Sequence, residues 1–328
     1  MNFREFTAGK DDDGRRLDRI LRIFLKDLSL GEIYKLLRKG LIKVNNQKAK
    51  PELHINKGDV ISIADFLFQK DNKPADSDIK AGTFSGDLNI IFENEHLLII
   101  DKPYGVSVHG HEGSDGMELD KKVEAWYQQK KKTSASDSLA FHPGPLHRLD
   151  RNTSGLLVFS MSLAGAKWFS ESIKNHTVQK KYIGLAEGKF EKQELWEDKL
   201  TDSEKTVNGF HTVKNVEDDS EGQSAITTAT PLAWGRLNNI DVTLVEYQIK
   251  TGRKHQIRAQ SKIHGHPLAG DKAYGGKLKC KGREYFLQAY SLSFPQDNPL
   301  NLPQQIKMGL SPDFIDLLQC CEIENPGL

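Results

Sequence analysis

The chain has 328 residues, with 46 Lys and Arg against 45 Asp and Glu and a formal net charge of +1. This length allows about two or three domains, one of them with a sizeable core. The three cysteines, Cys280, Cys320 and Cys321, show no zinc-ligand spacing and favour a reducing compartment, so we expect a cytoplasmic protein. The acidic N-terminus lacks the apolar region of a signal peptide, and no apolar run approaches about 18 residues, so no membrane partner is expected.

The charges are unevenly distributed along the chain. Residues 15–60 carry twelve Lys or Arg against five Asp or Glu, and residues 251–285 carry nine against two. Residues 191–221 have the opposite balance, with ten acidic and four basic residues. Two basic segments separated by an acidic one predict a polyanion held at two places, and chance clustering of solvated charge is the alternative for either segment.

The N-terminal basic segment predicts two helices followed by a small sheet. Apolar residues recur at spacings of three and four over residues 17–28, the pattern of a helix with one buried face. Ser29 and Glu32 form a capping box for a second helix, which Gly40 is placed to end. Strands are predicted at residues 41–44 and 60–63, so we expect a first domain at residues 1–64.

Residues 65–87 lack periodicity and are predicted to be a linker to a second domain at residues 88–328. Residues 88–92 and 97–100 predict a hairpin that leads into the turn Asp101-Lys102-Pro103-Tyr104-Gly105. A polar insertion at residues 128–138 is expected to be mobile.

Strands dominate the rest of the second domain. They are predicted in the acidic segment and, as core strands, at residues 155–160, 180–185, 225–230, 240–249 and 286–294. Helices are predicted at residues 162–175, after a strand within 253–261, and around Phe314, Leu317 and Leu318. This pattern indicates an α+β fold, a mixed and largely antiparallel sheet with flanking helices and loops, plus a small N-terminal α/β module.

One loop of this domain concentrates charged residues. It runs from His147 to Gly155 with the sequence H-R-L-D-R-N-T-S-G, between a Pro-Gly-Pro break and a predicted strand. Arg148 and Arg151 flank Asp150 and should keep it ionised by lowering its pKa. A permanently charged carboxylate suits a nucleophile, although the same residues would suit a carboxylate that caps a turn and pairs with a surface arginine.

This loop resembles the signature of the RluA-type pseudouridine synthases, in which H-R-L-D is followed by T-S-G and a hydrophobic strand. Lys181-Tyr182 and the stretch T-G-R-K-H-Q-I-R at residues 251–258 resemble two further motifs of that family, in the same order. The resemblance covers residues 88–295 and is strongest to the branch acting on large-subunit ribosomal RNA. It implies the isomerisation of uridine to pseudouridine in RNA, with no cofactor and no metal.

The resemblance also implies catalytic roles. Asp150 would be the nucleophile that attacks either the ribose or the base, and Arg258 would be its ion-pair partner. Tyr182 would pack against the detached uracil and take the proton from carbon 5. Gln288 is a departure, because many relatives have histidine there, and this leaves the polar contact at that position open.

Other basic residues are expected to bind RNA. Arg148 would fill the space that the flipped base leaves, since a guanidinium stacks on neighbouring bases. Arg253 and His255 are expected to contact RNA, although His255 could equally complete a hydrogen-bonded turn. The N-terminal helices and sheet resemble the αL RNA-binding module, which implies phosphate contacts from Lys35, Arg38, Lys39 and Lys43.

The same residues raise several alternative functions. A serine hydrolase built on His147, Asp150 and Ser154 lacks the G-x-S-x-G elbow, and a metal-dependent RNA enzyme lacks a cluster of ligand residues. A non-catalytic ribosome-assembly factor would need the basic segments but not Asp150, Tyr182 and Arg258 together. The same isomerase acting on transfer RNA stays an alternative, and we expect a monomer in either case.

Overall fold

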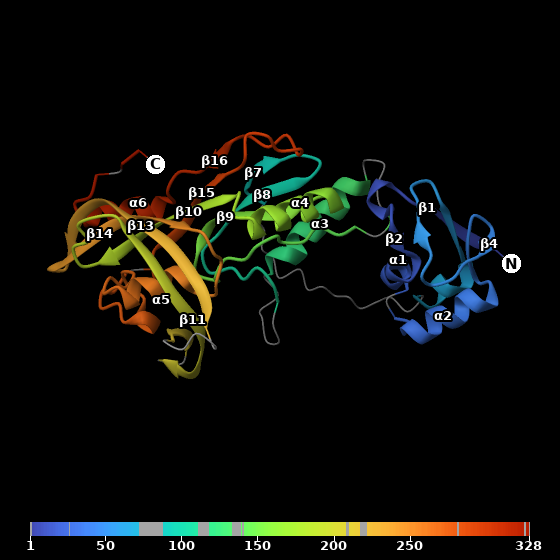
Figure 1. The fold of residues 1–328 in the computed structure, drawn as a ribbon, viewed down its shortest axis with the longest axis horizontal. Coiled ribbons are helices and arrows are strands. Elements are labelled where there is room, and N and C mark those ends of the chain that lie inside the picture. Colours follow the sequence, from blue (N-terminus) through green and yellow to red (C-terminus); the bar gives the residue numbers. More distant parts are fainter. Residues whose placement is uncertain are drawn as a thin grey trace. The chain divides into compact units, whose positions relative to one another are not determined.

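The computed structural model describes residues 2–25, 27–71, 88–110, 118–132, 139, 141–207, 210–216, 222–280, 282–324 and 326–327 (Figure 1). Contacts within the chain group it into two compact units, which are described separately here. The first contains Met1–Asp87, Asp115–Gly144 and Met161–Ala164, and the second contains Leu88–Ser114, Pro145–Ser160 and Gly165–Leu328.

The first unit begins with a four-stranded sheet and two helices. The helices are α1 (Leu17–Phe24) and α2 (Leu30–Lys39). The sheet has the order β1-β6-β3-β4, from β1 (Phe3–Thr7), β3 (Ile42–Val44), β4 (Gln47–Lys48) and β6 (Val60–Ala64). The first unit also contains short elements outside this sheet: η1 (Lys10–Asp12), the paired strands β2 (Arg15–Arg16) and β5 (His54–Ile55), and η2 (Asp65–Asp71). Both predicted helices and both predicted strands are confirmed, whereas β1 was not predicted.

Local sequence signals explain why α2 begins and ends where it does. The Ser29 hydroxyl accepts a hydrogen bond from the backbone N–H of Glu32, and the Glu32 carboxylate accepts one from the Ser29 N–H. Gly40 ends the helix in the left-handed conformation with φ +71°. The predicted capping box and glycine stop are therefore both confirmed. The apolar face of α1 and α2 packs on the sheet through Leu17, Ile20, Leu21, Ile33 and Leu37.

One helix of the first unit was not predicted. α3 (Leu119–Lys132) includes residues 128–132, the start of the polar insertion that was expected to be mobile. The rest of that insertion, residues 133–138, lies outside the described residues. The predicted linker begins with η2, and its residues 72–87 also lie outside the described part of the chain.

A ten-stranded sheet organises the second unit, with the order β12-β11-β13-β14-β10-β15-β9-β8-β7 and β16 paired with β15. Its strands are β7 (Ile90–Glu93), β8 (Leu97–Lys102), β9 (Ser154–Ser160), β10 (Gln179–Glu187), β11 (Glu194–Val207), β12 (Phe210–Asn215), β13 (Gln223–Leu237), β14 (Ile240–Ile249), β15 (Leu287–Ser293) and β16 (Gln305–Lys307). Among the described pairings, β9 with β15 is parallel and the others are antiparallel. The predicted α+β class with a largely antiparallel sheet is confirmed.

Helices flank this sheet. They are α4 (Leu163–Lys174), α5 (Gln256–Ile263), the short η3 (Lys272–Tyr274) and α6 (Pro312–Cys320). Both α4 and α6 were predicted; α4 buries Phe169, and α6 buries Phe314 and Leu318. The strand predicted before α5 is wrong, because residues 253–255 form a turn in which His255 has φ +50°. No helix within the described ranges is both long and apolar enough to cross a membrane.

The parallel pair of β9 and β15 brings two distant parts of the chain together. Gly155 has φ +108°, and a Cβ atom there would lie 2.1 Å from the carbonyl oxygen of Ala289. Only glycine allows this approach, which explains the T-S-G sequence at the start of β9. On β15, Gln288 is buried, donates to the carbonyl of Gly309 and accepts from the N–H of Ser311. Gln288 therefore fixes the chain before α6.

Candidate active site

The loop before β9 carries Asp150 and is held by contacts from β8. The backbone N–H of Thr153 donates to the carbonyl of Asp150 at 3.0 Å, which closes a turn. The carbonyl of Arg151 accepts from the Gly105 N–H at 3.0 Å and from the Lys102 Nζ at 2.9 Å. These hydrogen bonds hold the loop through the backbone of Arg151, and none of them uses the Asp150 side chain.

Lys102 is the centre of that anchoring. Its side chain is buried at the end of β8, and burial lowers the pKa of Lys102 to about 7. Its Nζ donates to the carbonyls of Pro103, Val106 and Arg151 at 3.0, 2.8 and 2.9 Å. Three acceptors match the three N–H groups of an ammonium, so we assign the protonated form to this site. Lys102 was expected to lie in a turn, and no role was predicted for it.

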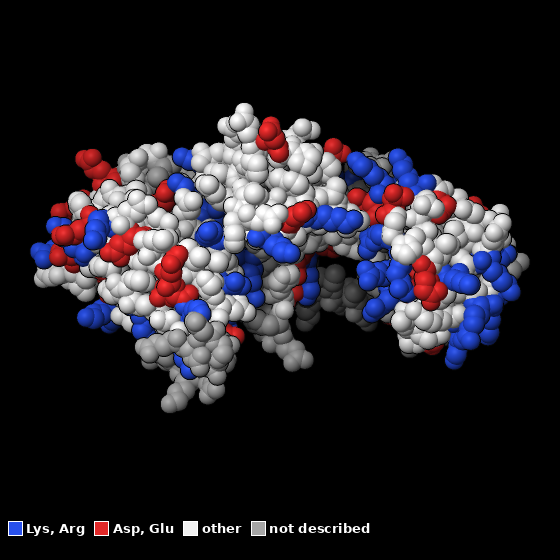
Figure 2. Space-filling model, in the orientation of Figure 1, with Lys and Arg blue, Asp and Glu red and all other residues white. Residues whose placement is uncertain are grey.

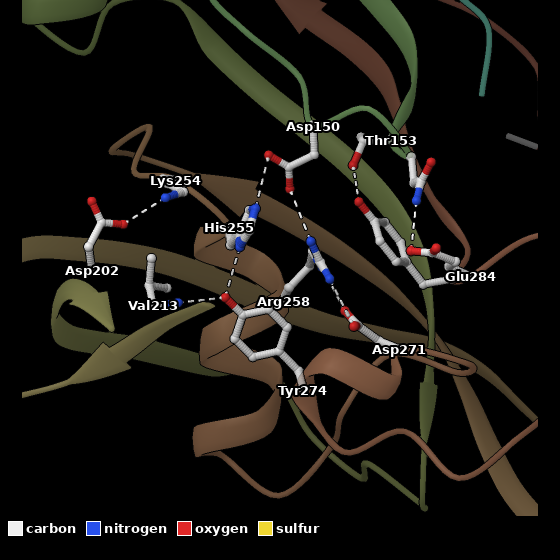
Figure 3. Close-up of polar contacts among 12 residues, drawn as sticks. Asp150, Thr153, Asp202, Val213, Lys254, His255, Arg258, Asp271, Tyr274 and Glu284 are labelled. Carbon is white, nitrogen blue, oxygen red and sulfur yellow. Dashed lines mark hydrogen bonds and ion pairs between the residues drawn. The ribbon is translucent and has the colours of Figure 1, made fainter. Parts of the chain in front are cut away.

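The carboxylate of Asp150 lies near two basic side chains (Figure 3). Its Oδ2 is 3.8 Å from the Nη1 of Arg258, and its Oδ1 is 3.9 Å from the Nε2 of His255. Both distances exceed hydrogen-bond length, and 21% of the Asp150 side chain is exposed. Asp150 is therefore oriented by charge while its oxygens stay available to a substrate.

The arginines next to Asp150 in the sequence are not its close partners. Within the described residues, the basic groups that reach 4.0 Å of its carboxylate are those of His255 and Arg258. Arg151 instead donates from Nε to the carbonyl of Gly105 at 2.9 Å. The sequence prediction therefore named the wrong guanidinium groups, because the arginine that reaches Asp150 comes from α5.

Arg258, on α5, is itself fixed by a second carboxylate. Its Nε and Nη2 donate to the two oxygens of Asp271 at 2.7 and 2.9 Å, and these side chains are 9% and 1% exposed. Its guanidinium lies 4.9 Å from the ring centre of Tyr274 and 4.3 Å from that of Tyr285. Burial alone would lower the pKa of Arg258, but the bond to Asp271 and nearby negative charge raise it. The group is a permanent cation with Nη1 directed to Asp150.

Gly270 explains how Asp271 reaches this buried position. It has φ +88°, and a Cβ atom there would lie 2.6 Å from the carbonyl oxygen of Glu284. The turn that carries Asp271 therefore packs directly against the backbone that leads into β15.

His255 is held by a hydrogen-bond chain. The backbone N–H of Val213 donates to the Tyr274 hydroxyl at 2.9 Å, and this hydroxyl lies 2.9 Å from the Nδ1 of His255. Because the hydroxyl accepts from Val213, its own proton is free to go to Nδ1, which leaves the Nε2–H facing Asp150. Burial lowers the pKa of His255, so the neutral form is favoured near neutral pH. Asp150 therefore faces one fixed cation and one neutral donor.

Tyr182 lies in the same region, on β10. It is 6% exposed, and burial and the charge of Asp150 raise its pKa, so the phenol is neutral. A small pocket of about 50 Å³ is lined by Asp150, Tyr182, His255 and Arg258. A larger cleft of about 560 Å³ is also lined by Asp150 and Tyr182. The structure thus brings together the three predicted catalytic residues and His255.

The other predicted RNA-binding residues are distributed over both units. In the second unit, Arg148 is exposed and lines both cavities, while Arg253 donates to the carbonyl of Ser224 at 2.9 Å. In the first unit, Lys35, Arg38 and Lys39 are exposed, and the Lys43 Nζ lies 4.9 Å from the ring centre of Phe3. Figure 2 shows Lys and Arg gathered over this unit.

The residues that hold the site were not predicted from the sequence. Asp271, Tyr274 and Tyr285 fix Arg258 and His255, but no role was given to them. Asp271 could have been found, since it follows a glycine close after the third motif. The tyrosines carry no such signal, because an aromatic residue in a strand or turn usually belongs to the core.

Comparison with known proteins identifies two families along the chain. Residues 96–262 match the RNA pseudouridylate synthase family, and residues 15–61 match the S4 domain. Similar curated proteins include the "Ribosomal large subunit pseudouridine synthase C" of Haemophilus influenzae, 30% identical over 90% of this chain and 87% of that protein. The protein of the same name from Pasteurella multocida is 30% identical over 88% of this chain and 85% of its own length.

The fold is also similar to that of a solved structure. "Human RNA Pseudouridylate Synthase Domain Containing 4" superposes with a TM-score of 0.57 and 22% sequence identity, and the match covers 73% of this chain and 95% of that one. This likeness shows a shared fold.

Proposed function

The chain belongs to the RNA pseudouridylate synthase family, and we propose that it isomerises specific uridines of large-subunit ribosomal RNA, with Asp150 as the nucleophile. The observation that carries the assignment of Asp150 is its position 3.8 Å from an arginine that a second carboxylate already fixes. The carboxylate therefore has a fixed cation nearby without being consumed in a hydrogen bond. The name of the relatives and the S4 domain support this choice of substrate.

The reaction begins when the target uridine leaves its stack, at a cost of a few kcal/mol. We assign Arg148 to the space that the base vacates, since it is exposed and lines the cavities beside Asp150. Asp150 then attacks carbon 1 of the ribose or carbon 6 of the base. The bond from the ribose to nitrogen 1 breaks, the uracil turns over and carbon 5 joins the ribose. The bond that Asp150 formed to the ribose or to carbon 6 breaks and frees the carboxylate, the carbon 5 proton passes to a base, and nitrogen 1 takes up a proton. Atoms and charge balance without a cofactor.

Tyr182 and Arg258 support these steps. A neutral, buried phenol is a weak base, so we assign Tyr182 to packing against the uracil as it rotates. On the ribose route, Asp150 is a free carboxylate again when the carbon 5 proton must leave, and it is the stronger base of the two. Arg258 orients Asp150 by its charge, and the His255 Nε2–H can donate to a carbonyl of the uracil.

We assign RNA anchoring to the N-terminal module, with Lys35, Arg38, Lys39 and Lys43 as phosphate contacts. Arg253 is assigned to RNA as well, since it borders the cleft beside Asp150. We further propose a cytoplasmic monomer with domains at residues 1–64 and 88–328, in keeping with a ribosomal RNA substrate and with the free thiols of Cys280, Cys320 and Cys321.

The test is release of tritium from RNA labelled at carbon 5 of uridine. Purified protein is incubated with a large-subunit ribosomal RNA transcript or with transfer RNA transcripts, and the labelled solvent is counted. Release from the ribosomal transcript alone supports the proposal. Release from transfer RNA alone assigns the other substrate, and tight binding of both without release leaves a non-catalytic assembly factor.

A further inference from the structure

The larger cleft beside Asp150 is strongly basic. Its volume is about 560 Å³, and residues of β10, β14, α4 and the loop after β14 line it. Among the described residues of this lining, Asp150 is the one carboxylate. Six are Lys or Arg: Arg148, Lys174, Lys180, Lys250, Arg253 and Lys254. Such a cleft favours an anion that extends beyond the base itself.

Lys180 differs from the other cations of this cleft. It is 6% exposed, whereas Lys174, Lys250 and Lys254 are exposed side chains. Within the part of the chain that the structure describes, no carboxylate lies within 4.0 Å of its amine. Burial lowers the pKa of Lys180 to about 8. A desolvated amine with no anionic partner is costly for the fold, so it is a candidate for a ligand contact.

Lys181, the next residue on β10, differs from Lys180 in having an acidic partner. Lys181 pairs with Glu246, with 2.8 Å between Nζ and Oε1. Side chains alternate along a strand, so Lys180 and Tyr182 lie on one face of β10 and Lys181 lies on the other. The unpaired amine is therefore on the face that carries the proposed chemistry.

We propose that Lys180 binds the RNA phosphate next to the flipped uridine and so positions that nucleotide over Asp150. This inference rests on the proposed function and names a substrate contact that the reaction needs. Residues 180 and 182 are separated by about 6.6 Å along the strand, so a base that reaches Tyr182 leaves an adjoining phosphate within reach of Lys180. Both residues line the cleft together with Asp150.

The loop opposite Lys180 is shaped to admit this contact. A Cβ atom at Gly252 would lie 3.3 Å from the Lys180 Nζ, closer than most side chains tolerate. Glycine at this position leaves the amine room beside the loop of residues 251–254. Lys250 and Lys254 are exposed at the edge of the cleft and can attract the RNA backbone by their charge. Lys180 then contacts the phosphate at a position shielded from water.

The test compares Lys180→Met with Lys181→Met, a matched removal of one lysine from the opposite face of β10. The full-length proteins bind a large-subunit ribosomal RNA transcript over a series of KCl concentrations near pH 7, and tritium release gives kcat and KM. For Lys180→Met we expect the slope of log affinity against log salt to fall by about 0.7 to 0.9. KM should rise about tenfold, as for the loss of a charged hydrogen bond, while kcat at saturating RNA changes little.

Lys181→Met should retain the slope and KM of the wild type, and Lys180→Arg should retain the slope because it keeps the charge. A Lys180→Met protein with an unchanged slope overturns the proposal, and so does a fall in kcat with KM unchanged, which would place the amine on the reacting base. If Lys180→Met does not fold, Lys180→Gln replaces it. The salt series needs no turnover, so an inactive wild type would refute the function while the slopes still decide on Lys180.

Discussion

Two carboxylates lie near Arg258, and they differ in burial and in their distance from the guanidinium. Asp271 is 1% exposed and accepts two short hydrogen bonds from the guanidinium, at 2.7 and 2.9 Å. Asp150 is 21% exposed, and its nearest contact to the same group is 3.8 Å. Asp271 is held by two hydrogen bonds to Arg258, whereas the oxygens of Asp150 lie beyond hydrogen-bond distance of that group.

This difference suggests that Asp271 serves the stability of the fold and that Asp150 serves the proposed reaction. Asp271 pairs with a buried cation, and removing one partner of such a pair leaves an uncompensated charge. Removing the charge of Asp150 leaves Arg258 still bonded to Asp271 and still packed between Tyr274 and Tyr285. We infer that Asp271 fixes the arginine for the fold, and that the arginine then presents its remaining nitrogen to Asp150.

The largest effect on turnover is expected for Asp150→Asn. The amide keeps the size of the side chain but is not a nucleophile, so isomerisation should be abolished while RNA binding stays within a few fold. Because this side chain is partly exposed and forms no short ion pair, stability should change by less than about 0.5 kcal/mol. Tritium release, RNA binding and thermal unfolding measure the three quantities. Release above background in the purified variant would remove Asp150 from the reaction.

Asp271→Asn should be the more damaging change for the fold. It leaves Arg258 buried without its bidentate partner, and the loss of stability should be about 3 kcal/mol. Turnover should fall by about tenfold or more even below the melting temperature, because Arg258 can then swing to Asp150 and occupy its oxygens. Denaturant unfolding and kinetics on the folded protein test both effects. A variant with wild-type stability would show that the pair contributes nothing to the fold.

Much of this arrangement could be predicted from local sequence. The cap at Ser29 and the stop at Gly40 depend on hydrogen bonds within a few residues, so their sequence pattern is sufficient. The loop that carries Asp150 is bounded by Pro145 and Gly155, which restrict the backbone locally. The family motifs led to the proposal of Asp150 as the nucleophile, because the proposed chemistry requires one particular side chain.

The supporting contacts could not be predicted in the same way. Lys102 bonds to a carbonyl of Arg151, 49 positions away, and Thr153 contacts Tyr285, 132 positions away. These contacts exist because β8, β9 and β15 are neighbours in the sheet, and no periodicity specifies that order. α3 was missed for a different reason, since its polar residues give no clear apolar face.

The dependence of kcat/KM on pH below neutrality tests whether a close ion pair with Asp150 lowers activity. As pH falls below the ordinary pKa of histidine, about 6.5, His255 gains a proton, and burial places this step lower still. Its Nε2 is 3.9 Å from Asp150, so the imidazolium would form a closer ion pair and reduce the reactivity of the carboxylate. We expect kcat/KM to fall toward low pH. In His255→Asn, which tolerates the left-handed backbone, the fall should move to lower pH, and superimposable profiles would exclude His255 as the cause.

The smallest effect on the reacting groups is expected for cations of the N-terminal unit. Lys35, Arg38 and Lys39 are exposed on α2, and the buried face of that helix consists of Ile33 and Leu37, so replacing all three with Ala should leave the fold intact. If each contacts a phosphate, the slope of log affinity against log salt should fall by about 2 to 3 units. KM for RNA should rise, whereas kcat at saturating RNA should match the wild type, because the contacts of Asp150 and Asp271 to Arg258 are all made within the second unit. Saturation kinetics and a salt titration measure these quantities together. A collapse of kcat in the folded triple variant would mean that the N-terminal unit acts on the reacting groups, and an unchanged slope would mean that α2 does not meet the RNA backbone.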